Sequence, residues 1–110
     1  MRMTVKALSG MEFFTPVVLS KPEREIDGVY IGDLLSWVMG RASSGDAWIT
    51  IMSNVNILAV ASLADVSCII LAEGVSIEED VLETAKQKGI NILSSNVSIY
   101  DTAVYLSSIL

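Results

Sequence analysis

The feature that most constrains this chain is a four-fold alternation of short β-like runs with longer helix-like segments. The β-like runs cover residues 28–31, 47–51, 67–72 and 90–93, and the helix-like segments cover 33–42, 54–66, 76–89 and 98–110. Repeated strand–helix units are typical of a mainly parallel sheet with helices on its faces. We therefore predict an α/β layered fold, and the length suits one domain over residues 1–110.

The segment before the first unit predicts a short helix and one further strand. Thr4 is placed to cap a helix over residues 5–11, and residues 13–20 read as a strand. Pro16 cannot donate a hydrogen bond to a neighbouring strand, so this strand is expected at an edge of the sheet.

Helix boundaries are indicated by local capping signals. Ser76 with Glu79 predicts a capping box at the start of the third helix of the repeat, and Gly89 predicts its end. Ser98 with Asp101 repeats the capping pattern at the last helix. These signals favour well-defined helices at both places.

The balance of apolar and charged residues favours self-association. Hydrophobic residues make up 52% and charged residues 18% of the chain, against about 25% charged in an ordinary soluble domain. The segment from Asn54 to about Ala64 is apolar on nearly every side, and such a helix must be covered all round. A second copy would provide part of this cover; the alternative is a central helix wrapped by its own domain. The interface residues expected for a homodimer are Val55, Leu58, Ala59, Ser62 and Trp48.

Composition argues against several functional classes. The chain has no histidine, which removes the commonest general base and metal ligand, and no carboxylate or cysteine cluster has metal-ligand spacing. We predict no catalytic residue, no metal and no cofactor. A net charge of −6 with seven scattered Lys and Arg residues argues against nucleic acid. No apolar run approaches the roughly 20 residues that cross a bilayer, no signal peptide is evident, and Cys68 reads as a buried thiol. We expect a cytoplasmic protein that does not contact a membrane.

Polar residues follow each predicted parallel strand and form the candidate ligand site. In open parallel sheets, ligands bind beyond the carboxyl ends of the strands. The candidate ligand-binding residues are Gly32, Asp33, Ser53, Asn54, Gly74, Ser95 and Asn96. The alternative is that these residues only cap helices, because Ser, Asp and Asn are preferred N-cap residues. Capping is the simpler interpretation for Asp33 and Asn54, whereas Ser53, Ser95 and Asn96 have no obvious local role.

Three stretches of the chain resemble a known family. They are EREIDGVYIGDLLSWVMGRASSGDAWITI (23–51), NVNILAVASLADVSCIILAEG (54–74) and KGINILSSNVSIYDTA (88–103). Together they resemble the DRTGG domain, which is related to the N-terminal domain of HPr kinase/phosphorylase. Glu23 and Arg24 stand for the Asp-Arg pair of the name-giving motif, and Gly28 matches one of its glycines.

The resemblance implies a regulatory or oligomerising accessory domain that acts on a partner enzyme or signalling protein. The chain has no G-x-x-x-x-G-K-[ST] loop, so kinase chemistry is not implied. Two hypotheses stay open. The first is a non-catalytic regulatory domain that binds a small polar ligand, such as a nucleotide or phosphorylated metabolite. The second is a purely structural subunit of a larger assembly without a ligand.

Overall fold

A computed structural model describes residues 2–110 as a five-stranded sheet with five helices. The strands are β1 (Phe14–Leu19), β2 (Gly28–Ile31), β3 (Asp46–Thr50), β4 (Cys68–Leu71) and β5 (Asn91–Ser95). The helices are α1 (Val5–Ser9), α2 (Leu35–Arg41), α3 (Asn56–Ala64), α4 (Glu79–Lys88) and α5 (Ile99–Ile109). The predicted four strand–helix units are confirmed, as is the α/β class.

The sheet has the strand order β1-β5-β4-β3-β2. Strands β2 to β5 run parallel, and β1 pairs antiparallel with β5 at the edge. Pro16 lies in this edge strand, as its missing N–H predicts. The carboxyl ends of β2 to β5 therefore lie together at one end of the strands. This end of the sheet is called here the carboxyl edge, and the end where the amino ends of β2 to β5 lie is called the amino edge; neither term refers to the outer strands.

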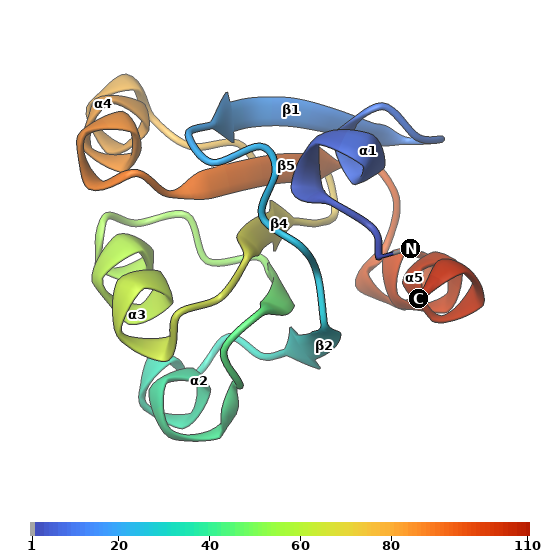
Figure 1. The fold of residues 1–110 in the computed structure, drawn as a ribbon. Helices are drawn as coiled ribbons and strands as arrows, with labels where there is room; N and C mark the ends of the chain where they lie inside the picture. Colours follow the sequence, from blue (N-terminus) through green and yellow to red (C-terminus); the bar gives the residue numbers. More distant parts are fainter. Residues whose placement is uncertain (1) are drawn as a thin grey trace.

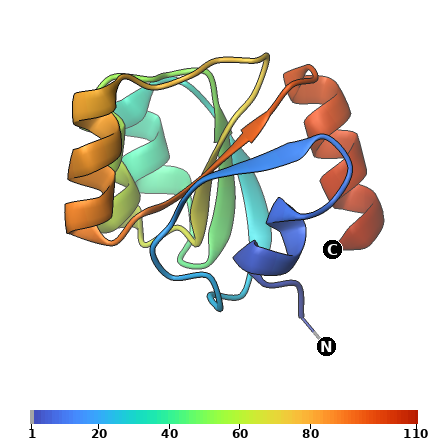
Figure 2. The ribbon, with the colours of Figure 1, turned by 90° about the horizontal axis from the view of Figure 1, so that it is seen from above.

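Helices cover both faces of the sheet, and each face has its own core. Figures 1 and 2 show α2, α3 and α4 on one face and α1 with α5 on the other. Trp48 and Ile69 pack toward α2, α3 and α4, whereas Ile49, Ile70 and Cys68 pack toward α1 and α5. This alternation along β3 and β4 is the two-residue period of a strand buried on both faces.

Most of the predicted helix boundaries are confirmed. The Ala7 N–H donates to Thr4 Oγ1 over 3.1 Å, and the Asp101 N–H donates to Ser98 Oγ over 2.9 Å. Gly89 ends α4 with φ of 71°, a left-handed conformation that glycine adopts without strain.

The predicted capping box at Ser76 is wrong. Helix α4 begins at Glu79, and the cap position is Glu78, which makes no side-chain capping bond. Glu78 is extended, with φ of −80° and ψ of 164°, and this leaves Ser76 two residues before the cap position. At that distance from the helix start, Ser76 does not act as the N-cap.

Helix α3 is only partly covered. Its inner side is buried by the sheet and neighbouring helices through Ile57, Leu58, Val60, Ala61 and Ala64, while Val55 and Leu63 remain exposed. Leu58 and Trp48 are fully buried in the chain's own core, so the expectation that they form an interface with another chain is corrected. Of the expected interface residues, Val55, Ala59 and Ser62 lie on the outer surface.

Within residues 2–110, none of the helices has the length and apolarity needed to cross a membrane.

Candidate functional site

All of the residues predicted to bind a ligand lie at or beyond the carboxyl edge, but they do not meet in one cavity. Gly32 and Asp33 follow β2, Ser53 and Asn54 follow β3, Gly74 follows β4, and Ser95 and Asn96 end or follow β5. Parallel pairing of the four strands brings these segments to the same edge. Their side chains then divide among separate local interactions.

Asp33 links the start of α2 to the end of β3. Its Oδ1 accepts hydrogen bonds from Thr50 Oγ1 at 2.7 Å and from the Ile51 N–H at 3.0 Å. The cap position of α2 is Leu34, so the interpretation of Asp33 as a helix cap is wrong. The carboxylate is instead occupied by donors from the neighbouring strand.

Ser95 is buried and has a structural partner. Its hydroxyl is 2.7 Å from Thr102 Oγ1 in α5, and the Ser95 side chain has no exposed surface. Gly74 is nearby, since its N–H donates to the Ser95 carbonyl over 3.1 Å. Ser95 therefore has the local role that the sequence did not reveal, whereas Asn96 is exposed.

Ser53 and Asn54 line an open hollow of about 460 Å³ between the start of α3 and the start of α4. Asn54 Oδ1 accepts from the Asn56 N–H, the first N–H of α3, over 2.9 Å. The cap position of α3 is Val55, which makes no side-chain capping bond, so the interpretation of Asn54 as the helix cap is wrong by one residue. The other wall of the hollow carries the carboxylates of Glu78 and Asp80. These two negative charges disfavour a phosphate-bearing ligand at this place.

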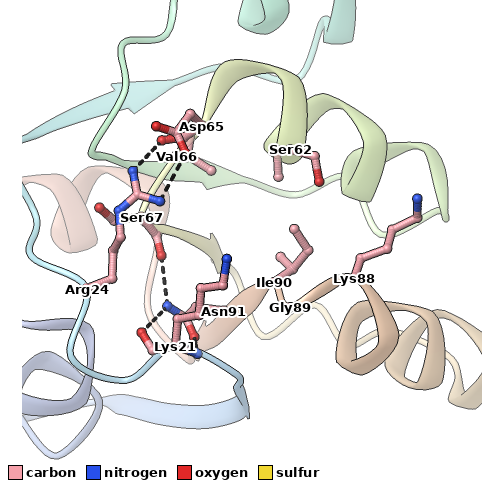
Figure 3. Close-up of a pocket in the computed structure, with 11 residues that line it drawn as sticks. Lys21, Arg24, Ser62, Asp65, Val66, Ser67, Lys88, Gly89, Ile90 and Asn91 are labelled. Carbon is pink, nitrogen blue, oxygen red and sulfur yellow. Dashed lines mark hydrogen bonds and ion pairs between the residues drawn. The ribbon is translucent and has the colours of Figure 1, made fainter.

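A second cavity, of about 140 Å³, lies at the amino edge and has the opposite charge (Figure 3). The loop before β2 and the C-terminal ends of α3 and α4 form it. Its lining includes three of the seven Lys and Arg residues of the chain, namely Lys21, Arg24 and Lys88. The remaining lining residues are Ala61, Ser62, Asp65, Val66, Ser67, Gly89, Ile90 and Asn91.

Arg24 and Asp65 form an ion pair at one side of this basic cavity. Arg24 donates to Asp65 Oδ1 over 3.0 Å and to the Asp65 carbonyl over 2.8 Å. The hydrogen bonds from Ser44 and Arg24 hold the pKa of Asp65 below its usual value. Asp65 ends α3 in the left-handed conformation, with φ of 58°, so this pair fixes the turn that closes the helix. The motif residue Arg24 thus has a structural role.

Asn91 holds the opposite side of the cavity in place. Its Oδ1 accepts from the Lys21 N–H at 2.8 Å, and its Nδ2 donates to the carbonyls of Lys21 at 2.8 Å and Ser67 at 3.0 Å. A Cβ on Gly89 would lie 3.4 Å from Lys21 Cε, so the lysine stem passes over this glycine. The backbone that carries Lys21 is therefore fixed by a buried side chain.

Two of the three cations have no carboxylate partner within the described part of the chain. The ion pairs between side chains of residues 2–110 are Arg2–Asp27, Arg24–Asp65 and Lys86–Glu83. Figure 3 shows Lys21 extending between Arg24 and Ile90, with Ser62 and Lys88 farther along the cavity. None of the sequence-based site predictions included this cavity. The only local signal was the basic last turn of α4, which also suits the helix dipole.

Both the sequence and the fold are similar to those of known proteins. A sequence model of the DRTGG domain matches residues 17–109. No curated protein sequence gives a significant match. A similar solved structure is the crystal structure of the CBS and DRTGG domains of the regulatory region of Clostridium perfringens pyrophosphatase complexed with the activator diadenosine tetraphosphate.

The structural match has a TM-score of 0.72 at 17% sequence identity and covers 88% of this chain and 43% of that chain. At this identity the likeness establishes a shared fold, and this chain spans less than half of the crystallised regulatory-region chain. The family assignment rests on the sequence match, which extends over nearly the whole chain and includes Arg24 and Gly28. The chain belongs to the DRTGG domain family.

Proposed function

We propose that this chain is a non-catalytic regulatory domain that self-associates and responds to a small polar ligand on behalf of a partner protein. The observation that carries the proposal is an apolar stripe on the outer side of α3, formed by Val55, Ala59 and Leu63. These residues are four apart and so share one side of the helix. Leu63 is 71% exposed and Val55 is 48% exposed.

Exposed side chains of α2 add apolar area on the same face of the sheet. Trp37 is 52% exposed, and the guanidinium carbon of Arg41 lies 3.6 Å from the centroid of its ring. Helix α2 packs against α3, and exposed apolar groups gathered on neighbouring helices mark interaction sites more often than single exposed residues do. Aromatic and arginine side chains are also enriched at protein interfaces. A second copy that covers α2 and α3 would bury these groups.

The family match supports a regulatory role. The solved relative places a DRTGG domain in the regulatory region of a pyrophosphatase whose structure contains a dinucleotide activator. By analogy, the present domain would respond to a ligand and transmit this response through contact with a partner. The alternative is a structural subunit without a ligand. It is supported by the structural roles of Asp33, Asn54 and Ser95, three of the residues expected to bind a ligand.

Multi-angle light scattering tests the self-association. The wild-type chain is expected to elute as a dimer, and Leu63→Glu as a monomer, because the new carboxylate would be buried in the interface. Tyr100→Glu is the matched control, since Tyr100 is 75% exposed on α5 at the opposite face of the sheet. A monomeric wild type would overturn the proposal, and a dimer lost only in Tyr100→Glu would move the interface to α5.

A thermal-shift screen of nucleotides and phosphorylated metabolites tests the response to a ligand. A ligand that binds the folded state raises Tm by an amount that grows with the logarithm of its concentration relative to its Kd. A screen without any shift would favour the structural subunit.

A further inference from the structure

We infer that the basic cavity at the amino edge is an anion site that takes the phosphoryl end of a ligand through Lys21 and Lys88. This inference rests on the proposed regulatory function and names the site and chemical class of its ligand. It differs from the sequence-based expectation, which placed the ligand at the opposite edge of the sheet.

The basic cavity has a local positive charge. The chain is acidic overall, with a net charge of −6, yet three cations and one carboxylate line this cavity. Arg24 neutralises Asp65, which leaves the charges of Lys21 and Lys88 without a paired carboxylate among residues 2–110. Figure 3 shows Lys21 and Lys88 on different sides of the cavity, and an anion between them would pair with both charges.

The positive charge of the two lysines exceeds the negative partial charge of the nearby helix ends. The C-termini of α3 and α4 face the cavity, and each helix C-terminus has a partial charge of about −0.5. Together they balance about one of the two free lysine charges. In addition, N–H groups of the turns bind carbonyls in the last turn of each helix: Val66 donates to Ala61, and Ile90 donates to Ala85. A net positive charge therefore remains after the helix ends are counted.

The backbone around the cavity is held in place by hydrogen bonds. Asn91 is 4% exposed and makes three hydrogen bonds that hold Lys21 and Ser67. Lys21 passes over Gly89, where a Cβ would lie 3.4 Å from Lys21 Cε. The exposed hydroxyl of Ser62 offers a further hydrogen-bond donor at the cavity wall. Part of the ordering cost of an anion complex is thus met before the ligand arrives.

The size and lining of the cavity define the ligand class. The volume of about 140 Å³ leaves space for one or two phosphoryl groups with retained water. Because the cavity opens to solvent, the rest of a ligand would extend outward from it. Its apolar wall is formed by Ala61, Val66 and Ile90, so the lining has no aromatic ring on which a base could stack. The recognised group is therefore a terminal phosphate or diphosphate.

Isothermal titration with inorganic pyrophosphate tests the site, with sodium chloride of equal ionic strength as the blank. We expect saturable binding that falls about tenfold or more in Lys21→Met and in Lys88→Met, because each variant removes a charge-assisted contact. The matched control is Lys86→Met. Lys86 lies in the same last turn of α4, pairs with Glu83 at 3.6 Å and does not line the cavity.

Three outcomes would overturn the inference: no saturable heat, binding unchanged in both cavity variants, or an equal loss in Lys86→Met. Thermal unfolding of each variant first establishes that it folds. Light scattering on the same samples separates this inference from the proposed function. If the dimer persists, or a ligand in the thermal-shift screen raises Tm, while pyrophosphate does not bind, then only the cavity assignment fails.

Discussion

The two edges of the sheet use their polar groups in opposite ways. At the carboxyl edge, Asp33 and Ser95 are bound to neighbouring strands and helices, so these groups stabilise the fold. At the amino edge, the buried Asn91 fixes the backbone, and Lys21 and Lys88 remain without a carboxylate partner in the described chain. At the edge where parallel sheets usually bind ligands, Asp33 and Ser95 serve the fold and the open hollow beside Ser53 is lined by carboxylates. The opposite edge has the unpaired positive charge.

The largest effect is expected from Asp33→Ala at the carboxyl edge. The substitution leaves the Thr50 hydroxyl and the Ile51 N–H without their acceptor, and hydrogen bonds to a charged group contribute about 2 kcal/mol. We therefore expect the free energy of unfolding in urea to fall by about 2 kcal/mol. Glu83→Ala, on the exposed side of α4, is the control and should change little. A loss as small as the control's would mean that Asp33 is free to bind a ligand.

A smaller effect is expected from Ser95→Ala. The variant loses the buried contact with Thr102, although Thr102 still donates to the Ser98 carbonyl at 2.7 Å. We expect a loss of about 1 kcal/mol in the free energy of unfolding. Asn96→Ala changes the adjacent exposed residue and should leave stability unchanged. Equal effects of the two variants would contradict the assignment of Ser95 to the core.

Almost no loss of stability is expected at the amino edge from the double variant Lys21→Met, Lys88→Met. Removal of two unpaired cations should change the free energy of unfolding by no more than about 0.5 kcal/mol. Any gain should shrink as salt is added, because salt screens the repulsion between the two charges. Urea unfolding at low and high salt measures this. A large loss would show that the lysines, like Asp33, belong to the fold.

A further effect depends on pH and concerns Asp65. Its folded-state pKa lies below the ordinary value of 3.8, so its ionised form stabilises the fold at higher pH. This contribution is lost as the pH falls through the folded-state pKa. Asp65→Asn should therefore be less stable than wild type at neutral pH, and the difference should shrink in acid. A difference that is constant with pH would contradict the lowered pKa.

The fold could be predicted because its signals are local. The two-residue and helical periods, Pro16 in an edge strand, and Gly89 at a helix end each depend on a few adjacent residues. The position of the strand ends then followed from parallel pairing. The prediction of a capping box at Ser76 was wrong, because Ser76 lies before the cap position of α4.

The site could not be predicted in the same way because its contacts join distant segments. Asp33 forms its hydrogen bond with Thr50 only when β2 and β3 pair in register. Ser95 forms its hydrogen bond with Thr102 only when α5 packs against the sheet. The cavity brings Lys21, Asp65 and Lys88 together from a loop and two helix ends. In the linear sequence these charges looked scattered, and their clustering depends on the strand order.

The inferred anion site predicts that a phosphoryl group binds at the amino edge and not at the carboxyl edge. Titration of the ¹⁵N-labelled chain with pyrophosphate, followed by amide chemical shifts, tests this. We expect saturable shifts at Lys21, Ser62 and Gly89, with the amides of Ser53, Asn54 and Asn96 unmoved. Shifts confined to Ser53, Asn54 and Asn96, or no saturable shift at either edge, would contradict it.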